Sequence, residues 1–99
     1  HINIVNTLLS RKASVDLCDN KGISPLHRAV SYGDIGIVSA LLEKNASVNL
    51  IDYEGESALH WAISNSTTRI DVVGKLLLSG SKTGRKDNNG YTPLMLVFL

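Results

Sequence analysis

The stretch DNKGISPLH, residues 19–27, decides the fold because the chain repeats it twice. It returns 33 residues later as DYEGESALH at 52–60, and 35 residues after that as DNNGYTPLM at 87–95. Outside it, the pattern Val-x-x-Leu-Leu begins at Val5, Val38 and Val73, at the same two offsets. Two unrelated blocks that share their spacing predict an array of repeated structural units.

The offsets also predict where the units begin and end. The second half of a unit occupies 1–18, full units occupy 19–51 and 52–86, and the first half of another unit occupies 87–99. The unit 52–86 has two extra residues, which fall in the polar tract Ser66-Thr67-Thr68. An insertion there costs little because the tract is typical of a loop.

Each unit is predicted to be a turn followed by two short helices. In the first full unit, Asp19 to Gly22 has the residues of a turn, and Ser24-Pro25 those of a helix start. Gly33 is expected to end this helix, and Asp34 to cap a second one that runs to about Lys44. Helices this short are not stable alone, so the units must stack and bury each other's apolar faces.

Composition narrows the class of protein. The chain has 99 residues, a net charge of +1 and one cysteine, Cys18. This is one domain without an internal disulfide, and the charge does not favour nucleic acid as a partner. The longest apolar run, 94–99, is too short to insert into a membrane. The first residue is His1, with no leader after it, so we expect a piece of a longer protein from the cytoplasm or nucleus.

No catalytic constellation is predicted. His27 and His60 occupy equivalent positions in successive units, too far apart to share one zinc ion, and each is expected to hydrogen-bond backbone or the serine of its own turn. Ser24, His27 and Asp34 include the residue types of a triad but lack a nucleophile elbow and an oxyanion hole. We therefore expect no enzyme activity, no metal and no cofactor.

The pattern Asp-x-x-Gly-x-Ser-Pro-Leu-His-x-Ala at 19–29, followed by Val-x-x-Leu-Leu and then Ala-x-Val-Asn, resembles the ankyrin repeat. The resemblance covers the whole chain, although Ala58 replaces the proline and Met95 the histidine. It implies an all-α solenoid of stacked helix-turn-helix units, with β-turn or hairpin fingers that project sideways. It also implies binding of a partner protein or peptide at the finger tips and on the solvent side of the first helices.

Carried onto this sequence, the partner-binding surface contains residues from three successive units. They are Asn20, Lys21, Ile23, Ser31, Tyr32, Ile51, Tyr53, Glu54, Glu56, Ser64, Asn65, Lys86, Asn88, Asn89 and Tyr91. The set includes all three tyrosines, which make good interface anchors, although Tyr32 could instead pack on the adjacent helix. Trp61 could either cover a neighbouring helix or anchor a partner.

Asn49 has two interpretations. The segment around Ser47-Val48-Asn49 resembles the sequence that an asparaginyl hydroxylase modifies in ankyrin repeats, with Ser47 in place of the usual acidic residue. Alternatively, the Asn49 side chain hydrogen-bonds the turn backbone.

Three other functions stay open beside partner binding. The array could be the non-catalytic part of a larger enzyme, channel or signalling or transcription regulator. It could bind nucleic acid, although its net charge of +1 does not favour this. It could also stack head to tail through apolar residues at its ends, namely Ile4, Val5, Leu8, Leu9, Leu94, Leu96, Val97 and Phe98.

Overall fold

A computed structural model describes residues 15–65 and 70–96 of the chain. The helices in these ranges are α2 (Pro25–Tyr32), α3 (Ile35–Glu43), α4 (Ala58–Ser64), α5 (Ile70–Leu78) and α6 (Pro93–Leu96). Neither range contains a β-strand. The all-α prediction is confirmed, and the projecting segments are β-turn loops rather than paired hairpin strands.

The helix starts are capped as the sequence predicts. Ser24 accepts a hydrogen bond from the backbone N–H of His27 (3.2 Å), and Ser57 accepts the same bond from His60 (3.4 Å). These side chains satisfy amides that the first helical turn leaves without partners. Ala58 therefore replaces a proline at the first helical position without loss of the cap.

The helix ends use left-handed backbone. Gly33 has φ +70° and ends α2, after which Asp34 accepts from the N–H of Gly36 at 2.8 Å and begins α3. Asn45 has φ +66° just beyond α3, at the place that Gly80 takes after α5. Asparagine is one of the few residues other than glycine that adopts this conformation at low cost.

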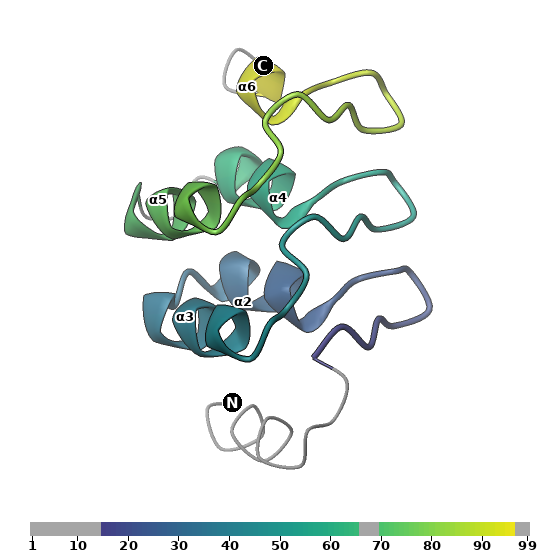
Figure 1. Cartoon of the computed structure of the whole chain (residues 1–99). Coiled ribbons are helices and arrows are strands. Elements are labelled where there is room, and N and C mark those ends of the chain that lie inside the picture. The colour runs from purple at the N-terminus through teal and green to yellow at the C-terminus, as the bar shows by residue number, and fades with distance from the viewer. Residues whose placement is uncertain (1–14, 66–69, 97–99) are drawn as a thin grey trace.

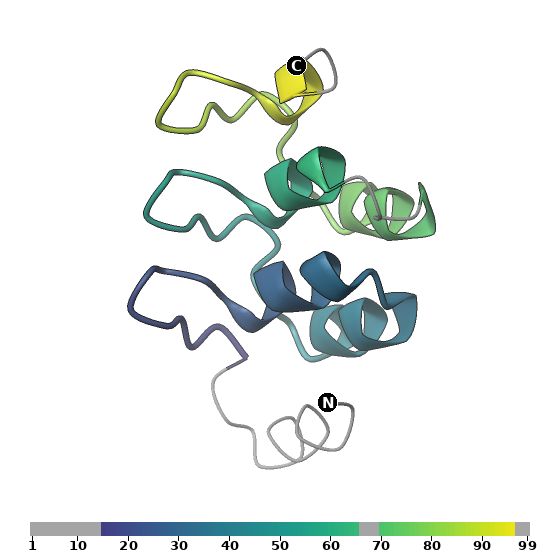
Figure 2. The ribbon, with the colours of Figure 1, turned by 180° about the vertical axis from the view of Figure 1, so that it is seen from behind.

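The helix pairs stack as layers (Figure 1). The first helices of the units, α2, α4 and α6, contact one another in order, and α3 contacts α5 in a second row behind them. The view from behind shows that the loops before the first helices all project from the same side of the stack (Figure 2). This arrangement places three loops and three first helices on one continuous face.

The core lies between the layers. Its largest fully buried apolar side chains are, from α2 to α5, Leu26, Val30, Val38, Leu59, Val72 and Leu76. They come at helical spacing from facing helices, so each layer removes the apolar surface of its neighbour from water.

Some sequence predictions fall outside the described residues. These are the half-unit residues 1–14, the insertion at 66–68, and the end residues Val97 and Phe98. Within the described ranges, no helix has both the length and the apolar character needed to cross a bilayer.

Candidate interaction surface

The projecting loops are three closely similar turns, which we call the first, second and third fingers: Asp19–Ile23, Asp52–Glu56 and Asp87–Tyr91. In each finger the Oδ1 atom of the aspartate accepts hydrogen bonds from two backbone N–H groups, two and four residues further on, at 2.8–3.0 Å. The backbone N–H of the same aspartate donates to the carbonyl of the fifth residue. These bonds close each loop, so the tips are preformed.

Hydrogen bonds also link one finger to the next. The Tyr53 N–H donates to the Lys21 carbonyl at 3.0 Å, and the Asn88 N–H donates to the Glu54 carbonyl at 2.9 Å. The side-chain amide of Asn88 adds a bond to the Tyr53 carbonyl at 2.8 Å. The three tips therefore form a single connected edge, and the spacing of their side chains is set by the fold.

Two histidines fix the second and third fingers to the first helix of the preceding unit. Nδ1 of His27 accepts from the Ser24 N–H (3.2 Å), so Nε2 carries the proton and donates to the Glu56 carbonyl of the second finger at 2.8 Å. His60 forms the same bonds to Ser57 and to the Tyr91 carbonyl. The expected bonds to the serine of the same turn and to backbone are both present, and the backbone partner is a carbonyl of the next finger, which was not predicted.

Burial keeps His27 neutral. It lowers the pKa of the imidazole, while the Glu56 carbonyl and the charges of Asp52 and Asp19 act in the opposite direction. The neutral ring is the form that both hydrogen bonds require, because a protonated Nδ1 could not accept from Ser24.

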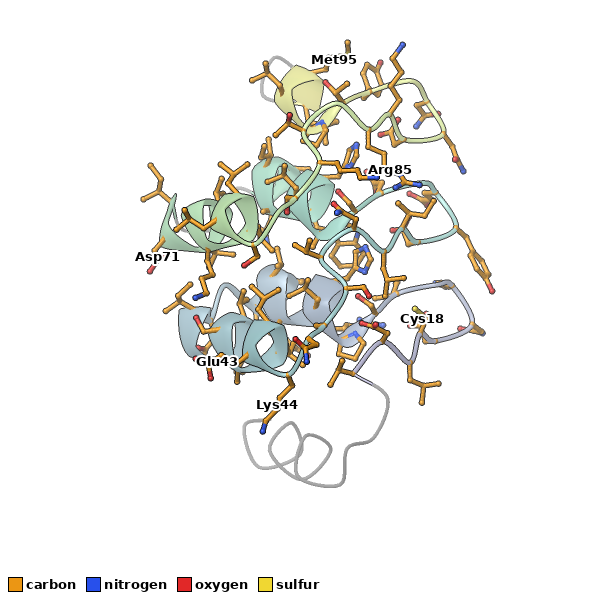
Figure 3. The ribbon with its side chains drawn as sticks, in the orientation of Figure 1. Cys18, Glu43, Lys44, Asp71, Arg85 and Met95 are labelled. Carbon is orange, nitrogen blue, oxygen red and sulfur yellow. The ribbon has the colours of Figure 1, made fainter. Side chains whose placement is uncertain are left out.

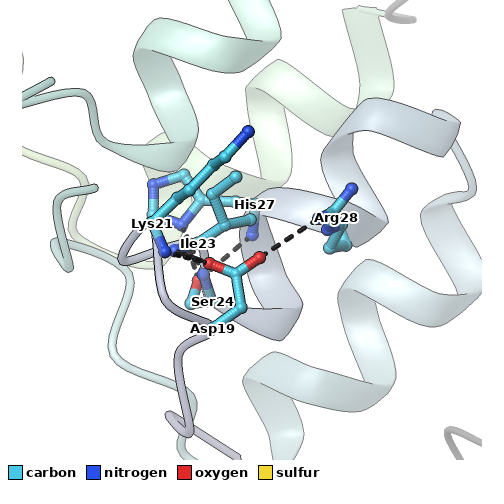
Figure 4. Close-up of polar contacts among 6 residues, drawn as sticks. All are labelled: Asp19, Lys21, Ile23, Ser24, His27 and Arg28. Atoms are coloured by element: carbon cyan, nitrogen blue, oxygen red, sulfur yellow. Dashed lines mark hydrogen bonds and ion pairs between the residues drawn. The ribbon is translucent and has the colours of Figure 1, made fainter. Parts of the chain in front are cut away.

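The carboxylate of the first finger is paired with a cation (Figure 4). Asp19 forms an ion pair with Arg28 of α2 at 3.1 Å, and Lys21 belongs to the same finger. Hydrogen bonds from the N–H groups of Ile23 and Lys21, and then the Arg28 side chain, lower the pKa of Asp19. Asp19 is therefore ionised and matched by a cation.

The second finger differs because Trp61 stands where α2 has Arg28. The Trp61 indole Nε1 donates to Oδ2 of Asp52 at 3.0 Å, and the ring meets His27 edge to face with 5.2 Å between centroids. Asp52 is only 7% exposed, whereas the Trp61 ring is half-buried. The packing interpretation of Trp61 is thus confirmed, while part of the ring remains accessible.

A cavity of about 300 Å³ lies between the first and second fingers and α4. We call it the finger groove; it is lined by Lys21, Ile23, Asp52, Tyr53, Glu54, Glu56 and Trp61. Five of these seven residues belong to the predicted partner-binding set. Burial raises the pKa of Glu56, and the neighbouring carboxylates of Asp52, Glu54 and Asp87 raise it further, with His60 acting weakly the other way.

The geometry agrees with a comparison of the sequence with known families. The family described as ankyrin repeats (3 copies) matches residues 1–86. The chain belongs to the ankyrin-repeat family. A search of curated proteins finds no significant match. Ankyrin repeats are generally protein–protein interaction modules and are typically non-catalytic.

The rest of the predicted surface is distributed over the same face of the ankyrin array. Tyr53 is 72% exposed and Tyr32 61% exposed, so packing does not bury either ring. Three members of the set, Ile23, Glu56 and Asn65, are partly covered. The remaining members are exposed, like the two tyrosines: Asn20, Lys21, Ser31, Ile51, Glu54, Ser64, Lys86, Asn88, Asn89 and Tyr91. Not all of them meet in one place, because Ser31, Tyr32, Ser64 and Asn65 lie at the far ends of α2 and α4.

Sequence reasoning did not consider Asp52 for the surface, and it gave Trp61 only as an alternative anchor outside the predicted set. A signal was present, since Arg28 and Trp61 each follow their finger aspartate by nine residues. Both side chains donate to that aspartate, so the pair Asp19–Arg28 could have indicated the pair Asp52–Trp61.

Asn49 lies in the segment after α3 and links its unit to the next one. Its Oδ1 accepts from the Lys82 N–H at 2.8 Å, and its Nδ2 donates to the Gly80 carbonyl at 3.2 Å. The equivalent Asp16 accepts from the N–H and the hydroxyl of Ser47. The Asn49 side chain thus bonds backbone, although of the next unit rather than of its own turn; its hydroxylation stays a prediction.

The triad residues have structural partners. Ser24 and His27 form the cap of α2, and Asp34 caps α3 through the N–H groups of Gly36 and Ile37. Among the described residues, no group of three or more His, Cys, Asp or Glu side chains could hold a metal ion.

Cys18 is half-buried, and its Sγ donates to the Asp16 carbonyl at 3.3 Å. Figure 3 shows it beside the first finger, and Glu43 and Lys44 far from it near the end of α3.

Proposed function

We propose that the chain recognises a partner protein through the face that carries the three fingers and the solvent side of α2 and α4. The observation that carries this proposal is the finger groove, which brings together five predicted contact residues and the accessible part of the Trp61 ring. The partner is a folded domain or an extended peptide, and no chemistry is performed on it.

The preformed state of the surface supports this function. The finger loops are closed by internal hydrogen bonds and joined by bonds between fingers, so little conformational entropy is lost when a partner binds. Tyr53 at the second finger tip offers a large, rigid, exposed side chain with a polar end, which is the character of an interface anchor.

The proposed activity is tested with the 99-residue chain as bait for chemical crosslinking in a cell extract. We expect Tyr53→Ala and Ile23→Ala to weaken capture of the same partner at least tenfold, and to change the free energy of unfolding by less than about 1 kcal/mol. Glu43→Ala and Lys44→Ala, on exposed residues of the second helix row, serve as controls and should leave capture unchanged. Partner capture that is unchanged in Tyr53→Ala and Ile23→Ala would reject this face.

The surface is the same whether the array stands alone or forms the non-catalytic part of a larger enzyme, channel or regulator. A compartment with reduced thiols, the cytoplasm or nucleus, fits the free Cys18. The sequence of the whole protein would distinguish these settings.

Self-association is a second candidate, favoured by exposed apolar residues late in the described chain. Leu78 is 89% exposed and Leu94 64% exposed, and Leu77 of the same helix α5 is also exposed. Apolar surface of this kind promotes stacking of copies. Sedimentation at rising concentration tests it: a mass that stays monomeric rejects stacking, whereas a dimer that Leu78→Ser and Leu94→Ser abolish supports it.

A further inference from the structure

The exchange of Arg28 for Trp61 between successive units leaves a local charge imbalance. In the first finger the carboxylate of Asp19 is paired with the guanidinium of Arg28. In the second finger the carboxylate of Asp52 accepts a hydrogen bond from an indole, which is a neutral donor. Both units thus have a hydrogen bond from the helix to the finger aspartate, but the donor carries a positive charge only in the first unit.

The lining of the finger groove is consequently negative. It contains three carboxylates, those of Asp52, Glu54 and Glu56, and one ammonium group, that of Lys21, which gives a formal charge of −2. Within the described part of the chain, neither Glu54 nor Glu56 forms an ion pair. Burial raises the pKa of Glu56, and the carboxylates of Asp52, Glu54 and Asp87 raise it further. The described residues therefore leave the carboxylates of Glu54 and Glu56 without an ion-pair partner.

Apolar and aromatic walls stand beside these carboxylates. The Trp61 ring is fixed from one side by Asp52 and from another by the edge contact with His27, so its orientation is set before any ligand arrives. Tyr53 and Ile23 supply further wall area. At about 300 Å³, the groove is at the lower limit of ordinary ligand sites, a size suited to one long side chain.

We propose that the finger groove binds an arginine side chain from an extended segment of the partner protein. The guanidinium would pair with the carboxylates of Glu54 and Glu56 and lie against the aromatic ring of Trp61. Arginine is the best match because its planar group forms paired hydrogen bonds with carboxylates and stacks on aromatic faces, whereas lysine offers a compact, strongly hydrated charge. This inference rests on the proposed function and specifies what the partner presents.

The test uses the fact that Trp61 is the sole tryptophan of the chain. The peptide acetyl-Gly-Arg-Gly-amide is titrated into the 99-residue chain while Trp61 fluorescence is recorded. We expect a saturable change, at least about tenfold weaker for the same peptide with citrulline, which is neutral but nearly identical in shape, and about threefold weaker with lysine. Wild-type protein is used throughout this comparison, so folding of variants does not affect it.

Charge variants locate the binding site. Glu56→Gln and Glu54→Gln should each weaken binding of the arginine peptide about threefold to tenfold, and Lys21→Gln should strengthen it. Glu43→Gln, which removes one exposed carboxylate on α3, is the matched control and should have no effect at moderate salt. Equal binding of the arginine and citrulline peptides, absence of a saturable response, or equal losses in Glu43→Gln and Glu56→Gln would each overturn the proposal.

Partner capture separates this inference from the function on which it rests. If Tyr53→Ala abolishes capture while Glu54→Gln and Glu56→Gln together leave it unchanged, the binding face stands and the arginine site is wrong. If the arginine peptide binds as described but capture does not depend on Tyr53 or Ile23, the arginine site stands and the proposed binding face is wrong.

Discussion

Trp61 donates to Asp52 at 3.0 Å in the same way that Arg28 donates to Asp19 at 3.1 Å. The two contacts join a finger to the helix that follows it, and they differ in burial, since Asp52 is 7% exposed and the Asp19 side chain 36% exposed. The exchange of arginine for tryptophan thus preserves a structural bond while it changes the charge and polarity of the surface around it.

Asp52→Ala is expected to lower the free energy of unfolding by about 2–3 kcal/mol, because it removes the acceptor of two backbone N–H groups and of the Trp61 indole in a buried place. Asp19→Ala, the matched change in an exposed turn, should lower the free energy of unfolding by less, because water can replace the lost acceptor. Urea unfolding measures both, and the emission of Trp61 should shift to longer wavelength in Asp52→Ala only. Equal losses in the two variants would contradict the role of burial.

His27 is expected to make the array less stable in acid. Burial holds the pKa of His27 below its ordinary value of 6.5, so the unfolded chain takes up a proton at a higher pH than the folded chain does. The contribution of neutral His27 to the free energy of unfolding is therefore complete above about pH 6.5. It is lost as the pH falls from there toward the lower pKa that His27 has in the folded chain.

The variant His27→Gln isolates this effect. Glutamine at this position still completes the capping box with Ser24, but it does not titrate and should lose the bond to the Glu56 carbonyl. We expect it to cost about 1 kcal/mol near pH 7.5, and the difference from wild type to narrow near pH 5. A difference that stays constant over this range, measured by urea unfolding, would show that the protonation of His27 does not affect folding.

Local features were predictable from the sequence because their partners lie within a few residues. The cap of α2 by Ser24, the end of that helix at Gly33 and the cap of α3 by Asp34 all agree with the predictions. Each rests on backbone conformation and hydrogen bonds within one turn, which residue type at a given spacing largely determines.

Contacts between units were not predictable in the same way. The bond from His27 to the Glu56 carbonyl and the bonds of Asn49 to Lys82 and Gly80 join residues about one repeat apart. Repetition in the sequence predicts that layers stack, but the distance and rotation between layers decide which atoms meet. The shape of the finger groove also depends on the distance and rotation between layers. The sequence could therefore predict that its residues share one face of the array, but not that they line one groove.

Gly55→Ala tests the contact between the second and third fingers. A Cβ atom there would lie 2.9 Å from the Asn88 backbone nitrogen and 2.5 Å from its side-chain oxygen, at φ +78°. Gly90→Ala is the matched control in the next finger, with φ +86° and nothing within 4 Å of the added atom. Both variants carry the strain of left-handed backbone, about 1 kcal/mol, and Gly55→Ala should cost a further 1–2 kcal/mol, roughly, because the third finger must move. Thermal unfolding that gives equal costs would mean that the fingers are not in contact.

Ser81→Ala is expected to stabilise the array. The Ser81 hydroxyl is buried without a hydrogen-bond partner among the described residues, while its N–H donates to the Leu76 carbonyl at 3.1 Å. Ala46 occupies the same position one unit earlier, with the same bond to the Leu41 carbonyl at 3.0 Å, so alanine fits this site without change in the backbone. Removal of the unpaired hydroxyl should raise the free energy of unfolding by about 1 kcal/mol, and Ala46→Ser should lower it by a similar amount. If both changes left stability unaltered in urea unfolding, the hydroxyl of Ser81 would have to be hydrogen-bonded in solution.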